Sequence, residues 1–114
     1  MTRSIYTIIF IFVWSSLFAA VQPGLEVFFA DKHYERLKGK KVGLITNHTG
    51  VDSQMRSNVG LLQNSLELAA LFSPEHGLKG HQYAWESVAH GKEGDIPVYS
   101  LHGETRRAKP EMLK

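Results

Sequence analysis

Two adjacent ionisable side chains, Glu75 and His76, are the residues of this sequence best suited to chemistry. They follow a proline at the end of the apolar run 66–72, and two nearby glycines prevent a long regular helix. A carboxyl group among apolar neighbours can keep a proton near neutral pH and donate it as a general acid. The alternative is structural, with Ser73 capping a helix and Glu75 favourably placed in its first turn.

Two short apolar runs must position these side chains. The runs at 42–46 and 66–72 are continuous rather than alternating, and the first is bounded by a glycine turn and Asn47. Continuous runs favour parallel strands that are covered on both faces. Polar loops at the carboxyl ends of such strands are where α/β proteins carry their chemistry.

A helix is expected between the two strands. Asp52 or Ser53 could cap it, and its inner side would carry Met55, Val59, Leu61 and Leu62. Strand, helix and strand then form a right-handed βαβ unit, whose two strands end at the same sheet edge. The loops 47–50 and 73–80 should therefore lie side by side, with Asn47 and His48 near Glu75 and His76.

The remaining segments are predicted to form shorter and less regular elements. Residues 31–37 carry charges spaced as on a short exposed helix, and residues 97–101 form a third short strand. Directly before this third strand, residues 81–96 are polar and irregular, and the length of this connection suggests a binding flap. A helix should begin at Pro110, because proline is favoured in a first helical turn. The pattern predicts the α/β class.

The N-terminal segment has the order of a targeting signal. A short basic start at Arg3 is followed by an apolar run over residues 5–21, then by small residues and a polar turn. Residues 1–20 are therefore predicted to be a secretory signal peptide, with a short membrane anchor over residues 5–21 as the alternative. The protein is expected to be exported, to the periplasm or outside the cell, with membrane contact only through this segment.

Composition limits the partners of the remaining residues, 21–114. Twelve basic residues face eleven acidic ones there, and no basic block indicates binding to nucleic acid. The chain has no cysteine, so disulfides and thiol chemistry are excluded. None of the six histidines forms a compelling ligand motif with another, so no metal and no cofactor are expected. The 114 residues allow one domain at most.

Several motifs together resemble one bacterial family. They are found, in chain order, at residues 24–26, 37–47, 49–51, 71–80, 97–103 and 107–113. This family was once known only as a domain of unknown function and is now associated with exo-β-N-acetylmuramidases, which remove terminal N-acetylmuramic acid from peptidoglycan fragments. The Pro-Glu-His-Gly core at 74–77, combined with the Gly-Lys-Lys-Val-Gly-Leu-Ile-Thr-Asn run at 39–47, makes the resemblance specific.

The resemblance implies a fold and a catalytic residue. Members have a Rossmann-like N-terminal domain, with a parallel sheet and flanking helices, and a smaller C-terminal domain. Their proposed catalytic glutamate corresponds to Glu75. The sequence departs from the family at Ser73 and Trp85, where glycine is usual, and at Lys79, which is often arginine. Residues 21–114 are accordingly expected to be the N-terminal part of a catalytic domain, truncated at its C-terminal end.

Further side chains could hold a sugar substrate. Asn47 and His48 could form hydrogen bonds with it, although asparagine at such a position often only shapes a turn. Lys79 could pair with a substrate carboxylate, or remain solvated. Trp85 could stack on a sugar face, or pack on the surface of the flap. His76 could orient Glu75 or bind substrate oxygens, and a structural role is the alternative.

Two functions follow from the sequence. The first is a cell-wall glycosidase of the exo-β-N-acetylmuramidase type, with Glu75 as acid/base and a peptidoglycan-derived sugar as substrate. The second is a truncated, non-catalytic α/β module that binds sugar, because no other carboxylate of the sequence has a clear pairing with Glu75. The sequence leaves the choice between them open, as it does the oligomeric state.

Overall fold

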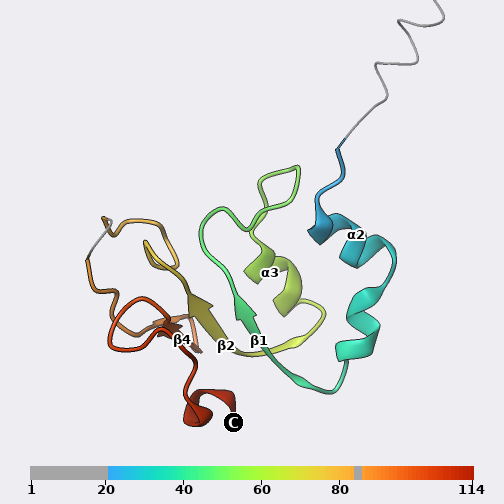
Figure 1. Cartoon of the computed structure of the whole chain (residues 1–114). Helices are drawn as coiled ribbons and strands as arrows, with labels where there is room; N and C mark the ends of the chain where they lie inside the picture. Colours follow the sequence, from blue (N-terminus) through green and yellow to red (C-terminus); the bar gives the residue numbers. More distant parts are fainter. Residues whose placement is uncertain (1–20, 84–85) are drawn as a thin grey trace, which may run out of the picture.

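The structure is a computed structural model and describes residues 21–83 and 86–114 (Figure 1). In this part of the chain, four strands form one sheet in the order β1-β2-β4-β3. The strands are β1 (Lys41–Ile45), β2 (Glu67–Ser73), β3 (Gly91–Glu93) and β4 (Ile96–Ser100). β1, β2 and β4 are parallel, whereas β3 pairs antiparallel with β4. The predicted α/β class, with a mainly parallel Rossmann-like sheet and flanking helices, is confirmed.

Short helices accompany the sheet in the described residues. They are α2 (Gly24–Ala30), the 3-10 helix η1 (His33–Leu37), α3 (Asn58–Gln63) and the 3-10 helix η2 (Pro110–Leu113). η1 falls within the short helix predicted over 31–37, and η2 begins at the predicted proline. The apolar segment that forms α2 had no predicted element, because seven residues are too few to show a helical period.

The predicted βαβ unit is present, but its helix begins later than expected. α3 starts at Asn58, and Ser57 caps it by accepting a hydrogen bond from Val59 N at 3.2 Å. The prediction that Asp52 or Ser53 caps this helix was wrong, because the Asp52 carboxylate instead braces the loop before it. Met55 lies in that loop, 78% exposed, and not on an inner helix face.

Apolar side chains gather on both faces of β2, which has a partner strand on each side. On the α3 face the buried cluster consists of Leu62, Leu66, Leu68, Leu71 and Val98. On the opposite face Ala70 and Phe72 pack with Met112 from η2. Burial on both faces explains why β2 reads as a continuous apolar run.

The segment predicted as an irregular flap, residues 81–96, is partly a β-hairpin. Gly91–Glu93 forms β3 and pairs with β4 across a tight turn, in which Gly94 has a φ of 58°. A positive φ at a two-residue hairpin turn is readily adopted by glycine. The flap prediction was therefore wrong for β3, because three residues carry no detectable strand pattern.

The predicted signal peptide or anchor, residues 1–20, lies outside the described residues, and the expected domain limits stay a prediction. Within residues 21–83 and 86–114, no helix combines the length and the apolar character needed to cross a membrane.

Candidate active site

Three loops meet at the carboxyl edge of the parallel strands. They follow β1 at residues 47–50, β2 at residues 74–80 and β4 at residues 102–107. Backbone hydrogen bonds continue to this edge, from Thr46 N to Phe72 O at 3.0 Å and from Leu101 N to Ser73 O at 2.8 Å. The sheet therefore fixes the start of each loop.

Glu75 lies in the loop after β2, with about half of its side chain exposed. Its Oε1 atom is 3.7 Å from Nε2 of His102, which begins the loop after β4 and is only 15% exposed. The alternative in which Ser73 caps a helix is wrong, because Ser73 ends β2 and the following residues form turns. The nearest ionisable partner of Glu75 in the described structure thus comes from a different loop.

His102 is the residue of this site that the sequence analysis did not single out. The sequence did contain a pattern that could have indicated His102, because this histidine directly follows the third predicted strand and would reach the same sheet edge as Glu75. What the sequence lacked was the strand order. β4 is hydrogen-bonded to β2, and this places the two loops next to each other.

His76, the chain neighbour of Glu75, is held away from it. Its backbone has a left-handed φ of 68°, and its Nδ1 lies 2.7 Å from the carbonyl oxygen of Gln82. Gln82 N also donates to His76 O at 3.4 Å. The imidazole therefore closes the loop 76–82. The role of orienting Glu75 that the sequence suggested for His76 stays a prediction, and the imidazole found 3.7 Å from the Glu75 carboxyl group is that of His102.

Asn47 and His48 occupy the neighbouring loop, as the βαβ unit predicted. Asn47 Oδ1 accepts hydrogen bonds from the backbone N and the hydroxyl of Thr49, at 3.0 and 2.7 Å, so this side chain shapes a turn. The ring of His48 lies against Gly80, where an added Cβ would collide with it. The contact joins the loops after β1 and β2.

Asp52 braces the longer connection from β1 to α3. Its buried carboxylate accepts hydrogen bonds from the backbone N atoms of Gln54 and Arg56 and from Arg56 Nε, at 2.6 to 3.0 Å. Burial of the carboxyl alone would raise the pKa of Asp52. The bonds from Arg56 and Gln54 outweigh this effect and hold the pKa below its ordinary value.

Glu26 of α2 reaches the same connection. Its Oε1 atom accepts a hydrogen bond from Ser53 N at 2.9 Å. Hydrogen bonding to Ser53 lowers the pKa of Glu26. The connection before α3 is therefore held by a carboxylate on each side, although it contains no regular element of its own.

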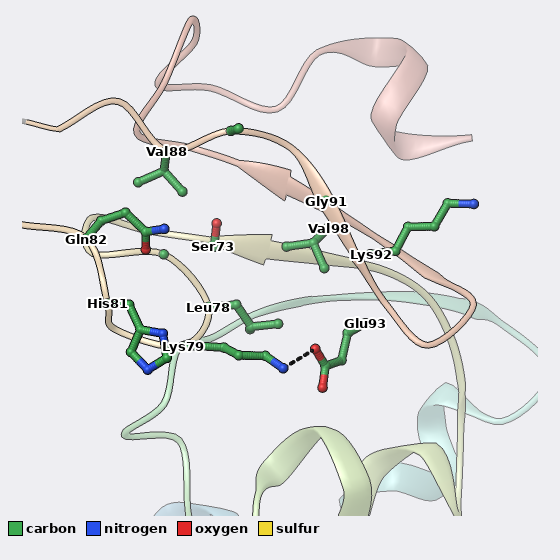
Figure 2. Close-up of a pocket in the computed structure, with 12 residues that line it drawn as sticks. Ser73, Leu78, Lys79, His81, Gln82, Val88, Gly91, Lys92, Glu93 and Val98 are labelled. Atoms are coloured by element: carbon green, nitrogen blue, oxygen red, sulfur yellow. Dashed lines mark ion pairs between the residues drawn. The ribbon is translucent and has the colours of Figure 1, made fainter.

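Two hollows adjoin at this edge. One, of about 350 Å³, is lined by the predicted binding residues Asn47, His48 and Lys79. The other, of about 220 Å³, is shown in Figure 2. Lys79 and Glu93 line both, and their side chains form an ion pair of 3.1 Å, drawn as a dashed line. Lys79 therefore pairs with a carboxylate of its own chain.

Ser73 lines the second hollow and is 1% exposed. Among the described residues its hydroxyl has no hydrogen-bond partner. Val88 and Val98 are the buried apolar side chains of this wall. A small recess with both polar and apolar walls thus begins two residues before Glu75.

The other predictions for the site remain open. Trp85 lies outside the described residues. In residues 21–83 and 86–114, no three histidine, aspartate or glutamate side chains come together as a metal site would require. The expectation that the protein uses no metal and no cofactor stays a prediction.

Comparisons with known proteins agree with the motifs. The family model described as "Exo-beta-N-acetylmuramidase NamZ, N-terminal" matches residues 42–114. The chain is 42% identical, over 98 residues, to the peptidoglycan beta-N-acetylmuramidase NamZ of Bacillus subtilis (strain 168). This match covers 82% of the chain and 23% of that relative.

A solved structure is also similar. The crystal structure of a DUF1343 family protein from Bacteroides fragilis NCTC 9343 matches with a TM-score of 0.65 and 43% identity. The match covers 82% of this chain and 23% of the other. The chain thus spans about a quarter of the length of both relatives. Because the family model covers well over half of the sequence, the chain belongs to the family of the N-terminal region of the exo-β-N-acetylmuramidase NamZ.

Proposed function

We propose that this chain carries the acid/base residue of a glycosidase that releases terminal N-acetylmuramic acid from peptidoglycan fragments. The observation that supports the proposal most is the position of Glu75. Its carboxyl group stands, half exposed, on the carboxyl edge of a parallel sheet and faces a largely buried histidine from a second loop. The related Bacillus protein is named a peptidoglycan beta-N-acetylmuramidase, which supports the substrate class.

Glu75 would act by transferring a proton. In its protonated form, the carboxyl group donates to the glycosidic oxygen as the bond to the leaving sugar breaks. The resulting carboxylate can then take a proton from the attacking water. Hydrolysis also needs a second group, which either attacks the sugar or activates water on its other face. We assign that second role to no residue of this chain.

The test measures turnover and binding separately. The 114-residue chain is incubated with a disaccharide that carries N-acetylmuramic acid at its non-reducing end, and the released sugar is quantified. Glu75→Gln should lower the rate by about 10³-fold and leave binding of the disaccharide unchanged, because general acid/base catalysis contributes about 10²–10⁴-fold. Glu104→Gln, an exposed carboxylate of another loop, is the matched control and should keep full activity. Equal activity of Glu75→Gln and the original chain would overturn the catalytic assignment.

A second candidate function is sugar binding without catalysis. It is favoured by the hollow that Asn47, His48 and Lys79 line, because Glu75 is not among the described residues around it. The same assay separates the two candidates. Saturable binding of the disaccharide without release of N-acetylmuramic acid would support the binding module, and loss of binding in His48→Ala would locate it. Absence of both binding and release would contradict both candidates.

We also propose that the protein is exported, on the basis of the apolar segment at residues 5–21. A reporter that is active only outside the cytoplasm, fused after residue 30, should be active with residues 1–20 and inactive without them. Mass spectrometry of the mature N-terminus distinguishes a cleaved signal peptide from an anchor. Equal reporter activity without residues 1–20 would contradict export by this segment.

A further inference from the structure

His102 is fixed in the molecule at its backbone as well as at its ring. Its backbone N donates to Ser100 Oγ at 3.0 Å, and its carbonyl oxygen accepts from Val88 N at 3.1 Å. Ser100 is 1% exposed and Val88 is also buried. The next residue, Gly103, lies so close to Val88 that an added Cβ would be 2.5 Å from its carbonyl oxygen. The backbone of His102 therefore has little freedom to move.

The partners of the His102 ring determine which nitrogen carries its hydrogen. Nδ1 lies 3.1 Å from an Nη atom of Arg106. A guanidinium group only donates hydrogen bonds, so Nδ1 must accept and must be unprotonated. The hydrogen of the neutral ring is then on Nε2, the nitrogen that faces Glu75 Oε1 at 3.7 Å.

His76 shows the opposite arrangement. Its Nδ1 faces a carbonyl oxygen, that of Gln82, and a carbonyl oxygen only accepts hydrogen bonds. Nδ1 of His76 must therefore carry a hydrogen. His76 is next to Glu75 along the chain and His102 faces it in space. Their partners thus place the ring hydrogen differently, on Nδ1 in His76 and on Nε2 in His102.

We propose that His102 is a positioning residue for Glu75 and that Arg106 holds His102 in the required tautomer. The Nε2–H group points at one carboxyl oxygen and fixes the orientation of the carboxyl group. This role deepens the proposed function, since it rests on Glu75 being the acid/base residue. A contact of 3.7 Å is long for a hydrogen bond, and such contacts commonly shorten when substrate binds.

The tautomer matters for the chemistry. A doubly protonated imidazole beside Glu75 would favour the ionised carboxylate and so oppose proton donation. A neutral ring that donates through Nε2 orients the carboxyl group without placing a full positive charge against it. The positive charge of this group of three side chains stays on the Arg106 guanidinium, which contacts Nδ1 of His102, while Glu75 lies by Nε2.

The first test is spectroscopic and does not depend on activity. Long-range ¹H–¹⁵N spectra of the imidazoles are recorded at about pH 8, where an ordinary histidine is neutral. The original chain should show His102 with its hydrogen on Nε2. Arg106→Met should convert this signal to a mixture of tautomers, whereas Arg107→Met, which removes the same charge one residue later, should leave it unchanged. A hydrogen on Nδ1 of His102 in the original chain would overturn the proposal.

The second test asks whether His102 positions Glu75. The side-chain carboxyl ¹³C signal of Glu75 should shift in His102→Leu and return toward its original position in His102→Gln, whose amide again offers a donor. In the turnover assay, His102→Leu should lower kcat by about tenfold with KM unchanged, and His102→Gln should recover most of that loss. An unaltered Glu75 signal in folded His102→Leu would overturn the positioning role. If the original chain shows no turnover, the proposed function fails while both spectroscopic results still decide the geometry.

Discussion

Two histidines lie near Glu75, and the loops that carry them hold them differently. His76 is its neighbour in the chain, but a left-handed backbone turns its ring to the carbonyl group of Gln82. His102 comes from the loop after β4, and its Nε2 faces the Glu75 carboxyl group. The difference shows that the order of strands at the sheet edge, and not proximity along the chain, selects the partner of Glu75.

The glycine that follows each histidine provides the sharpest test of this contrast. An alanine Cβ at Gly103 would meet the backbone carbonyl of Val88, and Val88 cannot move without disturbing the hydrogen bond that its backbone N donates to the carbonyl oxygen of His102. Gly103→Ala should therefore destabilise the protein by about 2–3 kcal/mol. At Gly77, where φ is 74°, an alanine Cβ would collide with the flexible side-chain amide of Gln82 and would lie at ordinary contact distance, 3.4 Å, from Cγ1 of Val88. Gly77→Ala should cost about 1–2 kcal/mol, mainly from the left-handed backbone.

Urea unfolding of the two alanine variants measures both effects. The original chain supplies the reference free energy of unfolding, and Gly91→Ala is a control because an added Cβ there meets open space. A larger loss at Gly77 than at Gly103 would contradict the view that the loop after β4 is the more rigid of the two.

The connection after β1 extends the comparison to a loop that is held by a carboxylate. The pKa of Asp52 is lowered in the folded protein, so the folded state binds fewer protons than the unfolded chain. The stability that Asp52 contributes is therefore complete above its ordinary pKa of 3.8 and is lost as the pH falls through the lower folded value. Asp52→Asn should destabilise the protein at pH 7, and the difference from the original chain should shrink steadily below pH 3.8.

Urea unfolding across this pH range tests the role of Asp52. Asp95→Asn, at an exposed hairpin turn, serves as the control and should show a smaller difference at pH 7. A difference between Asp52→Asn and the original chain that stays constant down to the most acidic conditions would show that the carboxylate does not stabilise this loop through its charge.

We expect His76 to stabilise its own loop and not to position the Glu75 side chain. Asparagine tolerates a left-handed backbone but cannot reproduce the imidazole bond to Gln82. His76→Asn should therefore cost about 1 kcal/mol, the usual net value of one hydrogen bond. His76→Ala should cost about 1 kcal/mol more, because it adds backbone strain.

Unfolding experiments give the two free energies, and the carboxyl ¹³C signal of Glu75 gives the second readout. That signal should change less in His76→Asn than in His102→Leu. The reverse order would mean that the chain neighbour, and not His102, sets the environment of Glu75.

The smallest effect is expected at Met55, another non-glycine residue with a left-handed backbone. Its φ is 62° and its side chain is 78% exposed, so it gains little from packing. Met55→Gly should stabilise the protein by about 0.5 kcal/mol, because relief of strain exceeds the entropy cost of glycine. Gln54→Gly, at a neighbour whose φ is negative, should destabilise it. Thermal unfolding compares the two, and equal effects would refute the strain at Met55.

Much of the fold could be predicted from the sequence, because parallel strands rich in apolar residues leave a strong local signal. β1 and β2 lie at the two continuous apolar runs, and β4 lies at the third predicted strand. β2 is covered on both faces as expected, but the same expectation was wrong for β1, which has no buried residue and whose Ile45 is 66% exposed. The helix start was misplaced because Asp52 has a good capping side chain that the loop uses instead. β3 was missed because three residues that include a glycine cannot display an alternating pattern.

The candidate site was predicted in part. The shared edge of the loops after β1 and β2 follows from βαβ geometry, and the contact of His48 with Gly80 confirms that these loops meet. Lys79, whose predicted binding of a substrate carboxylate stays a prediction, forms an ion pair with Glu93, a residue of the unpredicted strand β3. Pairing of that kind depends on an element far along the chain, so no local pattern could reveal it.

By itself, the sequence determined the α/β class, the family, and the placing of Glu75 at the end of a buried strand. These depend on local apolar patterns and on motifs that are contiguous in the chain. Only the tertiary structure decided which histidine faces Glu75. That choice depends on β4 pairing with β2 and on the sign of one backbone angle at His76, and neither is fixed by the residues next to Glu75.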